Sequence, residues 1–163
     1  MKAATISELK KELVKLEHNE LLDACLRMAK FKVNNKELLT YLLFKSHDEE
    51  GYADELCNEI GVMIGSKRQL PKKTMRKIIR WMDKCLRFSG DKETELQVRI
   101  FFCRQFVDRK MTFGRCRVSS NMYAGQIRKI EKVITKVHVD LQFDFRQQMT
   151  GLDALLRPAT SAY

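Results

Sequence analysis

Apolar residues recur along most of the chain at steps of three and four, which is the spacing of one face of an α-helix. Seven such series follow one another, separated by short polar breaks. The first series comes with Thr5 and Glu8, whose spacing is that of a capping box. We therefore expect seven helices, at about residues 5–16, 20–33, 36–47, 49–64, 72–88, 92–109 and 121–149.

The breaks between these series favour an all-α fold. Pro71 suits the first turn of a helix, and Ser89 with Gly90 suits a helix end. The chain of 163 residues contains 7 Gly and 2 Pro, too few for the turns of an all-β fold. Successive hairpins would span about 35 to 40 residues, as in HEAT-like α-solenoids, but no residue signature repeats at that period. We expect antiparallel helical hairpins, in an irregular bundle or a short α-α superhelix.

Length and local composition set the expected organisation. A chain of this length predicts one domain, which we place at residues 1–150, with 151–163 as a tail that is at most partly ordered. Within the domain, residues 36–47 hold six apolar residues in one short helix. Such a helix has no polar face, which predicts a central, buried position.

The segment 136–145, KVHVDLQFDF, permits two interpretations. An apolar residue stands at every second position, which is typical of a β-strand. A strand needs a pairing partner, however, and no other segment alternates in this way. The helical alternative extends the apolar series that begins at Ile127 and ends the helix at Gly151. We expect the helix.

If residues 136–145 form a helix, two apolar residues lie outside its expected buried face. Val139 and Phe143 lie four apart, on the side opposite Val137 and Leu141. A surface helix has no use for apolar side chains there. Either they are buried inside the protein, for instance by the following segment GLDALLRP, or they form a candidate contact with a protein partner.

Composition limits the compartment. No stretch approaches the roughly 18 to 20 continuous apolar residues of a membrane span. Lys10 and Lys11 interrupt the N-terminal region before any signal-peptide core. We expect a cytoplasmic protein that does not bind membranes. The five cysteines include no C-x-x-C pair, which predicts reduced thiols rather than a disulfide framework.

Charge is distributed unevenly along the chain. The net charge is +10. Residues 1–66 hold 9 Lys/Arg against 12 Asp/Glu, a balance of −3, whereas residues 67–163 hold 22 against 9, a balance of +13. The C-terminal part also carries a basic stripe at helical spacing, which only Asp83 interrupts. Its members are Lys73, Lys77, Arg80, Lys84 and Arg87. The stripe is either a phosphate-binding face or an ordinary solvated helix face.

The loop FGRCRV holds two more candidates for polyanion contact, Arg115 and Arg117. They flank Cys116, and neighbouring cations lower the pKa of a thiol. A catalytic cysteine also needs a base, and no histidine stands near it in sequence. Phe102 or Trp81 at the edge of the stripe is a candidate for stacking on nucleobases.

Other motifs give no catalytic or cofactor site. Acidic residues and His47 cluster in HDEEGYADELCNE, but acids also suit the first turns of a helix, and no metal-binding spacing occurs. GVMIGSKR differs from a P-loop in spacing and in the order of Ser66 and Lys67. We expect no enzyme activity, no metal and no small-molecule cofactor.

Two stretches, AKFKVNNKELLTYLLFKSHDEEGY and LRFSGDKETELQVRIFFC, resemble an uncharacterised family of small all-helical bacterial proteins. The resemblance covers most of the chain and implies an all-helical fold, without an activity, cofactor or site. Together these patterns favour a non-enzymatic helical interaction or scaffold protein, with a protein partner or self-association. The alternative is binding of nucleic acid or another polyanion through residues 67–117.

Overall fold

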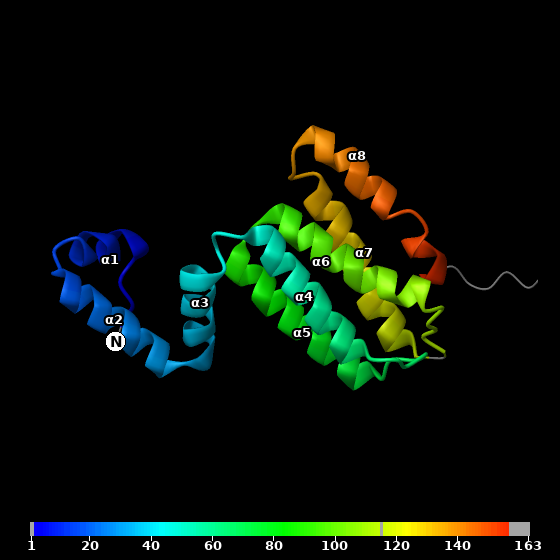
Figure 1. Cartoon of the computed structure of the whole chain (residues 1–163), viewed down its shortest axis with the longest axis horizontal. Helices are drawn as coiled ribbons and strands as arrows, with labels where there is room; N and C mark the ends of the chain where they lie inside the picture. The colour runs from blue at the N-terminus through cyan, green and yellow to red at the C-terminus, as the bar shows by residue number, and fades with distance from the viewer. Residues whose placement is uncertain (1, 115, 157–163) are drawn as a thin grey trace, which may run out of the picture. The chain divides into compact units, whose positions relative to one another are not determined.

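The computed structural model describes residues 2–114 and 116–156, and in these ranges it consists of helices without strands (Figure 1). The all-α prediction is therefore confirmed. Contacts between residues divide the chain into two compact units, Met1–Phe44 and Lys45–Tyr163, where the length alone predicts one domain.

The first unit holds three helices, α1 (Ile6–Leu13), α2 (His18–Phe31) and α3 (Val33–Phe44). The predicted capping box of Thr5 and Glu8 begins α1. Lys32 alone joins α2 to α3, and its extended backbone turns the chain sharply between them (Figure 1). The side-chain amide of Asn35 donates to the carbonyl of Met28 over 2.9 Å and holds this corner. Asn35 thus ties the two helices together.

The described residues of the second unit, 45–114 and 116–156, form five α-helices and a short 3₁₀ helix. They are α4 (Glu49–Ile64), α5 (Lys72–Ser89), α6 (Lys92–Asp108), α7 (Arg117–Ile134), α8 (Val139–Gln148) and η1 (Leu152–Leu156). Consecutive helices run antiparallel from α4 to α8 (Figure 1). The predicted end at Ser89 and Gly90 is confirmed, because Gly90 adopts a left-handed conformation at φ 71° and caps α5.

The core of this unit forms around α6, which packs against α4, α5, α7 and η1. The side chains of Leu96, Phe102 and Cys103 are fully buried on it. Next to them, Phe106, Phe113 and Tyr123 have ring centroids 5.2 to 5.6 Å apart. Such aromatic clusters bury a large apolar area and fix the angle between helices. The buried central helix is therefore α6.

The prediction of a buried helix at 36–47 is wrong. In α3 only Tyr41 is buried, whereas Leu42, Leu43 and Phe44 are more than half exposed. The apolar residues of α3 point in all directions, but the unit supplies only α2 as a close neighbour. A helix without a polar face requires cover on every side, and here the cover is missing.

Within the segment 136–145, residues 139–145 are helical and none is a strand, but residues 136–138 form a turn, so the expected continuation of the preceding helix is wrong. The chain leaves α7 at Thr135, and His138 begins α8 with its ring nitrogen accepting from the Asp140 amide. Thr135, Val137 and Val139 are β-branched, which weakens a helix locally. In the predicted tail, the hydroxyl of Tyr123 donates to the carbonyl of Leu152 over 2.8 Å and fixes η1 to the core. Residues 157–163 lie outside the described residues.

Candidate functional site

The basic stripe lies on the outer face of α5. Lys73, Lys77, Arg80 and Arg87 are exposed, and Lys84 is half-buried. The opposite face of the same helix carries the buried residues Met75, Ile78, Met82 and Leu86. Lys73, Lys77 and Arg80 line a shallow surface depression together with Thr74 and Arg76. Because basic and apolar residues recur at helical spacing along α5, the basic ones gather on one face and form one cationic surface.

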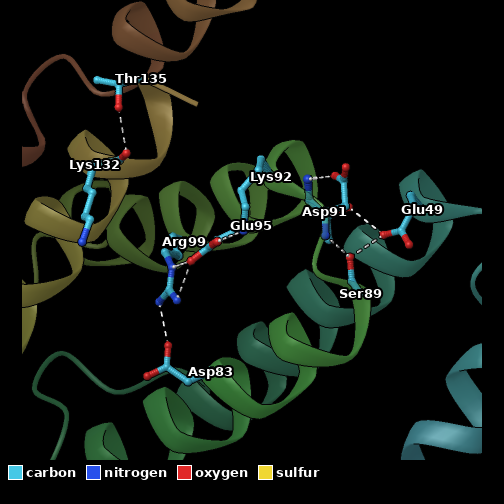
Figure 2. A network of polar contacts seen from close by, with 10 residues as sticks. Glu49, Asp83, Ser89, Asp91, Lys92, Glu95, Arg99, Lys132 and Thr135 are labelled. Atoms are coloured by element: carbon cyan, nitrogen blue, oxygen red, sulfur yellow. Dashed lines mark hydrogen bonds and ion pairs between the residues drawn. The ribbon is translucent and has the colours of Figure 1, made fainter. Parts of the chain in front are cut away.

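Asp83, the acid within the stripe, is half-buried and points toward Arg99 of α6 (Figure 2). Its carboxylate accepts from the guanidinium of Arg99 on α6 and from the ammonium group of Lys129 on α7, each over 2.8 Å. Arg99 is buried and is also bonded to Glu95, over 2.9 Å, and to the Gln126 side chain, over 2.6 Å. The negative charge of Asp83 is thus compensated by Arg99 and Lys129 at the edge of the helix bundle.

The ionisation of Asp83 reflects these contacts. Burial alone raises the pKa of its carboxyl, but the hydrogen bond from Lys129 and the charge of Arg99 outweigh burial and hold the pKa below its usual value of 3.8. Asp83 therefore remains ionised at neutral pH. Asp83 interrupts the stripe in sequence, but its charge is paired with Arg99 and Lys129.

Helix α7 adds a basic residue that the sequence pattern of α5 does not reveal. Lys129 reaches Asp83, so α7 lies along the edge of the α5 stripe. Lys132 is exposed one turn further along α7. Only the contact between α5 and α7 brings Lys129 to the stripe, because 45 residues separate it from Lys84 in sequence.

The loop before α7 contributes one described arginine. Arg117 is the first residue of α7 and is exposed, whereas Arg115 lies outside the described residues. Cys116 caps α7, and the pKa of its thiol is lowered by the hydrogen bond from the Ser119 hydroxyl, with a further contribution from the charge of Lys72. The influence of Lys72 indicates that the loop lies near the beginning of α5. In the described ranges the hydroxyl of Ser119 donates to the thiol of Cys116 over 3.3 Å, and no histidine bonds to it.

The aromatic candidates for base stacking separate into two cases. Phe102 is fully buried in the core, so its proposed stacking role is wrong. Its helical position on α6 faces Phe106, with ring centroids 5.2 Å apart. Trp81 is half-buried on α5, next to Arg80 in sequence. Its stacking on nucleobases stays a prediction.

The two apolar residues of the predicted partner contact lie on the solvent side of α8. Val139 is 73% exposed and Phe143 is 64% exposed, while Leu141 and Phe145 are half-buried. The end of α8 is held by Arg104 of α6, which donates to the carbonyls of Gln148 and Thr150. Val139 and Phe143 are exposed, so the described part of the following segment, which includes η1, does not cover them. The prediction that this segment buries them is wrong for residues 151–156.

A larger apolar surface lies on the first unit, and the sequence patterns misplace it in the core. Among the described residues, eighteen large apolar side chains are exposed, and fourteen of them belong to Ile6–Phe44. Leu26, Val33, Leu39, Leu43 and Phe44 line a groove of about 530 Å³ between α2 and α3. The sequence shows this surface only as an excess of apolar residues. Such an excess does not distinguish a helix buried in the core from a helix whose apolar side chains are exposed.

Other kinds of site find no support in the described ranges. They contain no group of three or more His, Cys, Asp or Glu residues placed to hold a metal ion. Across residues 2–114 and 116–156, no helix is both long enough and apolar enough to cross a membrane. Comparison of the chain with protein-family models, curated proteins and solved structures finds no match. The resemblance to small bacterial helical proteins, and the likeness to α-solenoids, therefore stay predictions.

Proposed function

We propose that this chain is a non-enzymatic interaction protein that binds a protein partner through exposed apolar helix faces. The observation that carries the proposal is the uncovered apolar surface of residues 6–44, where Tyr41 is the one buried side chain in the described part. Exposed apolar patches of this extent mark interaction sites in soluble proteins. Burial of a single Leu or Phe side chain contributes about 1.5–3 kcal/mol, so a few of these residues suffice for a stable contact.

The experiment replaces two neighbouring residues at the end of α3 in the full chain, Leu43→Ser with Phe44→Ser. Both side chains are more than 60% exposed. We expect the free energy of unfolding to change by less than about 0.5 kcal/mol, since no core contact is lost. Association, measured by light scattering and by capture of proteins on the immobilised chain, should be lost.

The matched control is Val62→Ser on α4. Val62 is 78% exposed but lies outside the apolar surface of residues 6–44. It should leave association unchanged. A wild-type chain that captures neither other proteins nor itself would refute the proposed function.

A second candidate function is binding of nucleic acid or another polyanion through α5. The observation that favours it is the pairing of Asp83 with Arg99 and Lys129, which compensates the one acid among the exposed basic residues of α5. A face of this kind neutralises phosphates and releases their counterions, so affinity falls steeply as salt concentration rises.

Lys77→Glu with Arg80→Glu tests this candidate, because both residues are exposed. Lys84 is kept, since it is half-buried and has a contact of its own. We expect weaker retention of DNA and RNA in gel-shift assays and a salt dependence shallower by about two phosphate contacts. Lys10→Glu with Lys11→Glu on α1 changes net charge equally and should have little effect. Absence of binding by the wild-type chain at low salt would exclude this function.

A further inference from the structure

The described residues of the first unit contain neither a disulfide nor a metal-binding group, which stabilise many small helical units. Units far below 70 residues depend on disulfides, a metal or association, because their own core is too small. Cys25 is a free cysteine, and the described residues hold no metal-binding group. With Tyr41 as the one buried side chain of its described part, this unit depends on association.

The surface available for association runs along α2 and its groove. Leu22 and Leu26 are 50% and 42% exposed on α2, and Leu26 also lines the groove between α2 and α3. Ala29, one turn after Leu26, presents only a methyl group there. A small residue next to larger apolar ones lets a second helix approach closely and fill the groove.

Charge on α2 is divided between its two halves. Glu17, Glu20 and Asp23 stand at its beginning, and Arg27, Lys30 and Lys32 stand toward its end, all six exposed. When two such helices lie antiparallel, each acidic half faces a basic half. A parallel arrangement would place like charges beside each other.

One row of residues fixes the position of the pairing. Asp23, Leu26 and Lys30 follow at steps of three and four, so they share one face of α2. Asp23 and Lys30 are seven residues apart, roughly 10 Å along the helix, which is too far for an ion pair within one helix. In the described part of the chain neither residue has an ion pair or hydrogen bond through its side chain. Leu26 lies between them, so the row is nearly symmetric about it.

We propose that this surface binds a second copy of the same chain, through antiparallel pairing of the two α2 helices about a twofold axis near Leu26. Asp23 of each copy then lies beside Lys30 of the other, and the Leu26 side chains meet at the centre. The inference rests on the proposed function and names the partner. In a twofold interface each contact occurs twice, so one charged pair sets the register at both ends. The apolar contact supplies the affinity, since exposed ion pairs contribute little.

Sedimentation of the purified full chain across the micromolar range tests the pairing. The wild-type chain should form dimers. Asp23→Lys and Lys30→Asp each place like charges together twice, and each should weaken dimerisation about tenfold. The double variant with both changes should dimerise like the wild-type chain. A mixture of the two single variants should form a mixed dimer, since one copy is then basic and the other acidic at both positions.

Glu59→Lys on α4 is the control, because it changes net charge as Asp23→Lys does at an exposed site in the other unit. It should dimerise normally. A chain that is monomeric throughout, or single variants that weaken association no more than Glu59→Lys, would overturn the pairing. Loss of protein capture by Leu43→Ser with Phe44→Ser in a monomeric chain would leave the proposed function standing and remove the second copy as partner.

Discussion

Arg99 of α6 donates to Asp83 of α5 over 2.8 Å, although the side chain of Arg99 is almost fully buried (Figure 2). The contact joins two helices that border the basic surface. It compensates the charge of the one acid in the α5 stripe, and it offsets part of the cost of burying the Arg99 cation. Removing one partner leaves the other incompletely paired.

Asp83→Asn should therefore destabilise the second unit. The amide keeps the shape of the side chain but loses its charge, while Arg99 retains Glu95. We expect the free energy of unfolding to fall by about 1.5–3 kcal/mol, the range for a hydrogen bond to a charged group. Urea unfolding followed by Trp81 fluorescence measures the change. Asp144→Asn on the exposed side of α8 is the control, and equal stability of the two variants would contradict the role of Asp83.

The same carboxylate should make stability depend on pH. The pKa of Asp83 is lower in the folded chain than its usual 3.8. On acidification the unfolded chain binds this proton first, so the stabilisation is complete above about pH 4 and is lost as pH falls through the folded pKa. Wild-type stability should fall more steeply between about pH 5 and pH 3 than that of Asp83→Asn. The lowered pKa of Glu8 remains in both proteins and cancels in the comparison. Identical slopes would contradict the assignment.

Helix ends were predictable where a local rule determines them. Thr5 and Glu8 cap α1, Gly90 ends α5, and Asp48 caps α4 through a hydrogen bond to the Gly51 amide over 2.9 Å. These features depend on residues three or four apart, which a sequence displays directly. The buried face of α5 was predictable in the same way, because its apolar residues recur at helical spacing.

Positions that depend on distant neighbours were not predictable. The apolar residues of α3 suggest a core helix, and only the fold shows that nothing in their own unit covers most of them. The direction of Asp83 depends on Arg99 and Lys129, which are 16 and 46 residues away in sequence. Periodicity also fails at 135–138, because the apolar series continues through the turn between α7 and α8.

The cysteines should differ in reactivity. Burial raises the pKa of Cys57 and of Cys103 to about 12, whereas the Ser119 hydrogen bond lowers that of Cys116. Only thiolates are alkylated readily, so iodoacetamide at mildly alkaline pH should modify Cys116 in the folded chain and leave Cys57 and Cys103 intact. Mass spectrometry of peptides identifies the sites. Ser119→Ala should shift the rate profile of Cys116 to higher pH; an unchanged profile would show that the hydrogen bond does not set its pKa.

The exposed pair on α8 gives a test that separates a surface role from a core role. Val139→Ser with Phe143→Ser should leave the free energy of unfolding within about 0.5 kcal/mol of wild type, because both side chains are more than 60% exposed. Leu141→Ser with Phe145→Ser, on the half-buried side of the same helix, should lower it by more than about 1 kcal/mol. Urea unfolding measures both. If the first pair proves as destabilising as the second, Val139 and Phe143 are core residues and α8 offers no apolar contact to a partner. If stability is kept while association weakens, α8 forms part of the binding surface along with residues 6–44.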